Sequence, residues 1–168
     1  MAGVDFQFNI SRGCGKYYYY AVENSLVLAS AGQFTSTANA AFVIVLIELT
    51  SIEADAALRD HDDLAALIAG SSNEQTNQAR KVLTDADLAA VPAPDDTNER
   101  YDLDIPDQTY TALGGNAIGK ALLCFDPDST TGTDSTIIPL VAFDVDVTPD
   151  GINDVVLQVA AAGYWRSS

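Results

Sequence analysis

The stretch Ala41-Phe-Val-Ile-Val-Leu-Ile-Glu-Leu-Thr50 decides the fold of this chain. It is an unbroken apolar run rich in β-branched residues, and such a run is typical of a strand that is buried on both faces. Side chains alternate between the two faces of a strand. One face is expected to carry Val43, Val45 and Ile47, and the other Phe42, Ile44 and Leu46. The stretch therefore predicts a central strand in a sheet that is covered on both sides.

Beyond Thr50 the composition changes to Ala, Leu, Asp and Glu. Leu64 and Ile68 recur at helical spacing, which predicts a helix over about 60–69 that ends at Gly70. His61, the only histidine of the chain, lies in this segment among aspartates. We expect His61 to lie on a solvated acidic face of the helix and not in a catalytic site.

Short apolar segments separated by turns fill the rest of the chain. The strands that they predict span residues 80–84, 100–105, 108–113, 117–125, 136–147 and 155–160. In the longest of these, Phe143 and Val145 alternate with Asp144 and Asp146, so one face is expected in the core and the other in solvent. Near the N-terminus, residues 4–10 alternate as a half-buried strand does, and a short helix is expected within 12–24.

These segments together predict an α+β fold, mainly antiparallel β-sheet in a small barrel or sandwich, with one or two short helices. We expect residues 1–168 to form a single domain with an exposed Pro- and Asp-rich connection at about 92–100. The hydrophobic content of 48% suffices for a core and argues against disorder. Cys14 and Cys124 give no disulfide framework. Two buried thiols are expected, and a disulfide between them is the alternative.

The charge of the chain excludes several classes of function. There are 24 acidic and 8 basic residues, with a formal net charge of -16, and no Lys or Arg lies between Leu122 and Tyr164. Nucleic-acid binding needs clustered basic residues, and anionic membranes repel such a chain. The longest apolar run is about eight residues, whereas a membrane-spanning helix needs roughly 20. We expect no nucleic-acid or membrane partner and an aqueous compartment. Adaptation to high salt is an alternative source of the acid excess.

The motifs of common enzymes are missing from the sequence. It has no Gly-x-Ser-x-Gly turn, no zinc-ligand spacing and no Cys-x-x-Cys. The segment Gly13-Cys14-Gly15-Lys16 lacks the spacing of a phosphate-binding loop and is followed by Tyr17 where Ser or Thr is required. The sequence therefore predicts a protein that is not an enzyme. A pair of aspartates acting on a glycan is the open alternative.

An acidic loop, residues 126–134, is the best candidate for a cation site. Asp126 and Asp128 alternate with other residues as the first ligands of a calcium loop do, and Asp134 follows. However, position 12 of such a loop would be Ile137 and not the bidentate Glu. We expect these residues to serve mainly as turn formers, with no cofactor. A weak calcium site at Asp126, Asp128 and Asp134 is the alternative.

Large aromatic side chains mark a candidate contact surface. Tyr and Trp are favoured at protein interfaces because they join a large apolar area to a polar group. The candidates are Tyr17, Tyr18, Tyr19, Tyr20, Tyr164 and Trp165. They predict a homo-oligomer or a complex with another protein.

Several stretches resemble a family of small acidic virion proteins of tailed double-stranded DNA bacteriophages. The similar stretches are 53–58 with 62–64, 79–84, 94–98, 104–108, 124–128 and the C-terminal Gly163-Tyr-Trp-Arg166. The resemblance covers most of residues 45–168. The segment 13–20 departs from it, since the family has a more helical, Arg-rich stretch there.

The resemblance implies a non-enzymatic structural protein located in the virion, which is assembled in the host cytoplasm. The first expectation is a capsid decoration or cement protein that binds the major capsid protein or other virion proteins. A tail or head-spike component is the alternative of the same class. The alternatives of another class are a cation-dependent binding module and a glycan-active enzyme.

Overall fold

The computed structural model describes residues 39–58, 60–84, 86–87, 101–103, 105–158 and 165–167. Several sequence predictions lie outside these residues. They are the strand at 4–10, the short helix within 12–24, the connection at 92–100, and the side chains of Cys14, Tyr17, Tyr18, Tyr19, Tyr20 and Tyr164.

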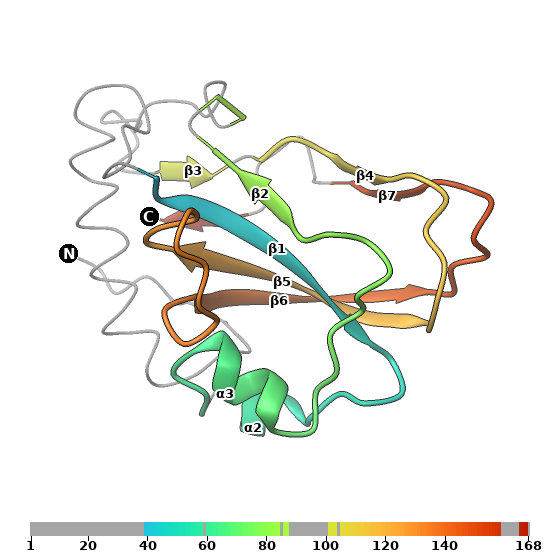
Figure 1. Ribbon diagram of the computed structural model, residues 1–168, viewed down its shortest axis with the longest axis horizontal. Helices are drawn as coiled ribbons and strands as arrows, with labels where there is room; N and C mark the ends of the chain where they lie inside the picture. The colour runs from blue at the N-terminus through green and yellow to red at the C-terminus, as the bar shows by residue number, and fades with distance from the viewer. Residues whose placement is uncertain are drawn as a thin grey trace.

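A four-stranded antiparallel sheet forms the centre of the described structure (Figure 1). Its order is β2 (Lys81–Leu83), β1 (Ala41–Glu48), β5 (Ile118–Asp126) and β6 (Ile138–Val147). Two ribbons complete the set: β3 (Tyr101–Leu103) pairs with β8 (Trp165–Ser167), and β4 (Gln108–Tyr110) pairs with β7 (Val155–Leu157). All these pairings are antiparallel, which confirms the predicted mainly antiparallel α+β class. The described strands do not close into a barrel.

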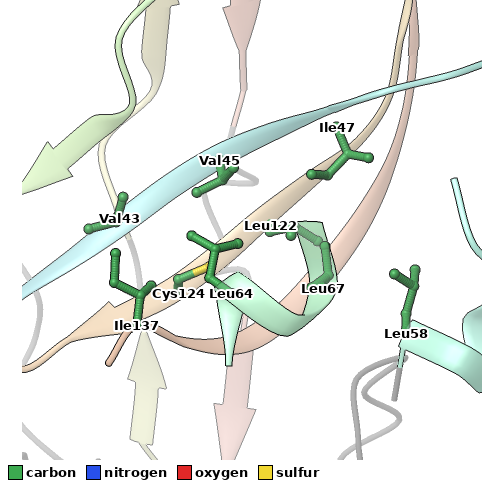
Figure 2. Close-up of a cluster of buried hydrophobic side chains, with 9 residues drawn as sticks. All are labelled: Val43, Val45, Ile47, Leu58, Leu64, Leu67, Leu122, Cys124 and Ile137. Atoms are coloured by element: carbon green, nitrogen blue, oxygen red, sulfur yellow. The ribbon is translucent and has the colours of Figure 1, made fainter. Parts of the chain in front are cut away.

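Both faces of the central sheet are buried, as the apolar stretch at 41–50 predicts. The first face lies under the helices (Figure 2). Its buried cluster is Val43, Val45, Ile47, Leu58, Leu64, Leu67, Leu122, Cys124 and Ile137. The opposite face lies under the β4–β7 ribbon, and its cluster is Ile44, Leu46, Leu83, Ile105, Tyr110, Leu113, Ile118, Ala121 and Leu123, with Phe42 partly buried. The predicted division of the β1 side chains between two faces is confirmed.

Two short helices, α2 (Asp55–Leu58) and α3 (Leu64–Ala69), replace the single predicted helix. The expected end at Gly70 is correct, because the Gly70 amide donates to the Ala66 carbonyl and closes the last turn. The expected start at about 60 is wrong. Asp63 has extended backbone angles and accepts a hydrogen bond from the Ala66 amide, so it is the N-cap and the helix begins at Leu64.

The remaining strands agree with the predicted segments, and most are shorter. The strand expected at 136–147 is β6, in which Asp144 and Asp146 are exposed and Val145 packs against the core. The predicted half-buried alternation is therefore confirmed. The short strand β8 was not predicted, because three residues carry too little periodicity. No helix in the described part of the chain is long and apolar enough to span a membrane.

Candidate functional site

The first two carboxylates of the acidic loop between β5 and β6 act as turn caps. Asp126 is buried, and its carboxylate accepts a hydrogen bond from the Asp128 amide at 3.1 Å. Asp128 in turn accepts from the Thr130 hydroxyl at 2.6 Å and from the Thr130 amide at 3.1 Å. These hydrogen bonds lower the pKa of Asp128. Both side chains therefore satisfy backbone groups of the turn, as turn-forming aspartates do.

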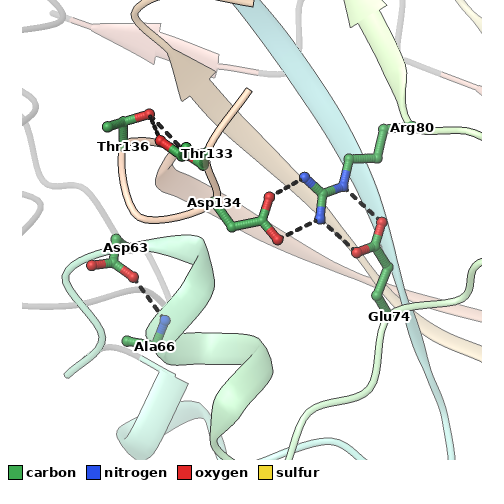
Figure 3. Close-up of polar contacts among 7 residues, drawn as sticks. All are labelled: Asp63, Ala66, Glu74, Arg80, Thr133, Asp134 and Thr136. Atoms are coloured by element: carbon green, nitrogen blue, oxygen red, sulfur yellow. Dashed lines mark hydrogen bonds and ion pairs between the residues drawn. The ribbon is translucent and has the colours of Figure 1, made fainter. Parts of the chain in front are cut away.

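The third carboxylate of the loop, Asp134, is held by Arg80 (Figure 3). Arg80 Nη1 and Nη2 donate to the two Asp134 oxygens at 2.5 and 3.0 Å. The same guanidinium donates through Nε and Nη2 to Glu74 at 2.7 and 2.6 Å. Hydrogen bonds from Arg80 lower the pKa of Asp134, and those to Glu74 and Asp134 raise the pKa of Arg80. Arg80 thus ties the loop to the segment that precedes β2.

The loop is also bound to the first turn of α3. The Leu64 amide donates to the Ile137 carbonyl at 2.9 Å, and the Ala65 amide donates to the Asp134 carbonyl at 3.1 Å. The Asp63 carboxylate accepts a hydrogen bond from the third amide, that of Ala66, at 2.7 Å (Figure 3). The first three amides of a helix have no partner within the helix itself. In this protein the loop and the N-cap satisfy them, so the loop is part of the scaffold of α3.

The loop carboxylates are directed at separate protein partners. Within the ranges that the structure describes, no three His, Cys, Asp or Glu side chains gather as a metal site requires. Asp126 and Asp128 cap their own turn, while Asp134 pairs with Arg80. The geometry therefore gives these residues structural roles, and a calcium site here would require Asp134 to leave Arg80.

A buried lysine at the helix-covered face was missed by the sequence reasoning. Lys120 of β5 is 7% exposed and pairs with Asp55 of α2 at 3.1 Å and with the exposed Asp144 of β6. Burial lowers the pKa of the Lys120 ammonium, but the hydrogen bonds to Asp144 and Asp55 outweigh it and raise the pKa overall. Lys120 and Asp144 are cross-strand partners. The signal in the sequence was a single Lys inside a predicted apolar strand.

His61 has a specific partner that the sequence did not reveal. Its Nε2 lies 2.5 Å from Glu53 Oε2, and the other Glu53 oxygen accepts from the Ser71 amide at 3.1 Å. The Glu53 amide donates to the hydroxyl of the buried Ser72 at 3.2 Å. His61 is half-buried and not on the open acidic face that was expected. The cluster holds the segment before α2 against the end of α3.

Amide side chains tie together the loops at the β1–β5 end of the sheet, another feature that sequence reasoning missed. Gln75 donates from its backbone to the Leu46 carbonyl and from its side chain to the Asn116 carbonyl, both at 2.8 Å. The Asn116 side-chain amide donates to a carboxylate oxygen of Glu48 at 2.9 Å. Gly115 has a φ of +93°, and a Cβ there would lie 1.8 Å from the Asn77 side chain. A larger residue at 115 would be strained by the positive φ and would have to displace the Asn77 and Gln75 side chains.

One buried hydroxyl stands apart from these networks. Tyr110 is buried in the face under the β4–β7 ribbon, and the described residues offer its hydroxyl no hydrogen-bond partner. Burial raises the pKa of Tyr110. Lys81 Nζ lies 4.9 Å from the centre of the ring, within range of a cation–π contact.

Of the aromatic contact candidates, the structure describes only the backbone of Trp165. Trp165 opens β8 and pairs through its backbone with Leu103 of β3. The other candidates lie outside the described residues. Comparisons of the chain with models of protein families, with curated proteins and with solved structures found no match.

Proposed function

We propose that this chain is a non-enzymatic structural protein of a tailed bacteriophage virion, located on the capsid as a decoration or cement protein. One observation carries the proposal beyond the resemblance of the sequence. Charged clusters in the described structure join segments that are distant in the chain, and so brace the loops against the sheet. They are Arg80 with Asp134, and Lys120 with Asp55 and Asp144.

Such bracing suits a protein whose task is to hold a shape. Side chains that could perform chemistry are used as cross-links: Arg80 joins the segment before β2 to the loop before β6, and Lys120 joins α2 to the sheet. A rigid surface binds a partner at a lower entropic cost than a mobile one. A decoration protein, which must hold its contacts for the lifetime of the particle, benefits from this rigidity.

Three carboxyl groups of the described structure are poor candidates for the general acid of a glycan-cleaving enzyme. A general acid in a glycan-cleaving enzyme works with a raised pKa. Hydrogen bonds lower the pKa values of Asp128, Asp134 and Asp150. These groups stay ionised at neutral pH, which favours a structural role.

The acidic surface supports a place on the outside of a particle. A net charge of -16 repels free DNA and also neighbouring particles of the same kind. The major capsid protein or another virion protein would then be the partner, and a homo-oligomer the form of the bound protein. Cation-dependent binding and glycan cleavage are the alternatives of another class.

The location of the chain in the intact particle tests the proposal. Purified virions would be separated into heads and tails, each fraction probed with an antibody against the recombinant protein, and the heads imaged by electron cryomicroscopy. We expect the protein in the head fraction, as density on the outer surface of the shell. Presence in the tail fraction alone would favour the tail or spike alternative. Absence from the particle would overturn the proposal.

A further inference from the structure

The segment 150–156, which leads into β7, presents apolar side chains to solvent. Ile152 is 80% exposed and Val156 is 47% exposed, and they are two of the four large hydrophobic side chains that the described residues leave exposed. The segment comprises most of the β6–β7 connection, at the right-hand end of the view, and the first two residues of β7 (Figure 1). Val155 and Leu157 turn inward to the core, so Val156 lies on the outer face of the ribbon. We name residues 150–156 the β7 ridge.

Hydrogen bonds fix the backbone of the β7 ridge. Asp150 accepts from the amides of Ile152 and Asn153 at 2.9 and 2.8 Å. The Gly151 amide donates to the Leu113 carbonyl at 2.9 Å, and Asp154 accepts from the Ala112 amide at 3.0 Å. An exposed Ile152 is therefore held in place on a rigid turn. A turn whose backbone is ordered in advance loses little entropy when it binds a partner.

The charge around the β7 ridge restricts its occupant. Asp150 and Asp154 flank Ile152 and are exposed. No Lys or Arg occurs between Leu122 and Tyr164. A second copy of this strongly acidic chain, a nucleic acid and an anionic membrane would all meet like charge at this surface. A protein surface with an apolar pocket and a rim of Lys or Arg is complementary to it.

We propose that the β7 ridge docks into such a pocket, with Ile152 as the apolar anchor and Asp150 and Asp154 facing the basic rim. The occupant is a protein of the particle shell, so this inference rests on the proposed function. Buried apolar anchors at the centre of an interface carry most of its binding energy, while rim charges set its salt dependence. Ile152 should therefore control affinity, and the aspartates should make binding sensitive to salt.

Binding of the full-length protein to purified shells that lack it tests the inference. The variants are Ile152→Ser and, as a matched control, Val82→Ser, which removes an exposed hydrophobic side chain from β2 at a different part of the sheet. We expect Ile152→Ser to weaken binding at least about tenfold without a change in melting temperature, and Val82→Ser to bind within about twofold of wild type. Wild-type binding should weaken steadily as NaCl rises from about 0.05 to 0.5 M.

The possible failures are distinguishable. Wild type that does not bind the shells would overturn the proposed function, and with it the identity of the occupant. Wild type that binds while Ile152→Ser binds equally well would overturn the β7 ridge alone. Equal losses in Ile152→Ser and Val82→Ser would also overturn it, since the effect would not be specific to the ridge. Binding that is insensitive to salt would contradict the inference that the pocket of the partner has a basic rim.

Discussion

Arg80 and Asp134 are 54 positions apart in the chain, and two hydrogen bonds of 2.5 and 3.0 Å join the guanidinium of one to the carboxylate of the other. Arg80 also donates from Nε and Nη2 to the Glu74 carboxylate. One side chain therefore connects the segment that precedes β2 with the loop that precedes β6. Arg is suited to this task because its planar fork matches two carboxylates at once.

Arg80→Met should destabilise the protein by about 1–3 kcal/mol, because two half-buried carboxylates would be left close together without a cation. Urea unfolding measured by circular dichroism gives the free energy of unfolding. Arg80→Lys is the control, since it keeps the charge and loses the fork, and an intermediate loss is expected. Wild-type stability in Arg80→Met would contradict the structural role of the pair.

Stability should fall as the pH drops below about 4. The folded-state pKa values of Asp134 and Asp128 are lowered from an ordinary value of 3.8. The unfolded chain therefore binds more protons in this range, and the stabilisation, complete above the unfolded pKa, is lost as the pH falls through the folded pKa. Melting temperatures from pH 7 to pH 2 measure this loss. In Arg80→Met the slope below pH 4 should be shallower. An identical slope in both proteins would show that Asp134 contributes nothing to it.

Ile44→Ala should cost about 2–5 kcal/mol, through lost burial and a residual cavity. Ile44 is 2% exposed in the central strand β1. Ile44→Asp should prevent folding, because its charge would be buried without a partner. Val82→Ala, at an exposed position of the neighbouring strand, should change stability by less than about 0.5 kcal/mol. A soluble Ile44→Asp protein with a normal melting temperature would contradict the central position of β1.

Gly115→Ala should be more damaging than Gly132→Ala. Both glycines have positive φ, but a Cβ at Gly115 would meet the Asn77 and Gln75 side chains, whereas one at Gly132 has nothing within 4 Å. We expect about 1 kcal/mol for Gly132→Ala from backbone strain alone, and about 2–4 kcal/mol for Gly115→Ala when the clash is added. Chemical denaturation of both variants measures the difference. Equal costs would mean that the side-chain amides move aside freely.

Tyr110→Phe should leave stability unchanged or raise it by up to about 1 kcal/mol, since the change removes a buried hydroxyl that the described residues leave unpaired. Tyr110→Ala, which also removes the ring, should cost about 3–5 kcal/mol. Thermal and urea unfolding of the two variants distinguish the hydroxyl from the ring. A loss of more than about 1 kcal/mol in Tyr110→Phe would show that the hydroxyl has a partner.

The local pattern of the sequence determined the strands and their buried faces. The run at 41–50 specified a strand covered on both sides, because an uninterrupted apolar stretch has no face to offer to solvent. The alternation of apolar and acidic residues around Val145 specified a half-buried strand, because side chains two residues apart lie on the same face of a strand. Gly70 marked the end of α3, because glycine is common just past the last turn of a helix. Each of these features depends on residues that are close together in the chain, so the sequence alone is enough to predict it.

Tertiary structure alone decided which distant groups meet. With 24 acidic residues and 8 basic ones, the sequence allows many partners for each cation, and only the fold selects Asp134 for Arg80 and Asp55 for Lys120. The start of α3 was likewise undetermined, because three nearby aspartates could all cap a helix. Asp63 is the cap because the carbonyls of Asp134 and Ile137 reach the amides of the two residues that follow it. Those carbonyls belong to a loop about seventy positions later in the chain. A pattern of neighbouring residues therefore cannot predict their hydrogen bonds to the first turn of α3.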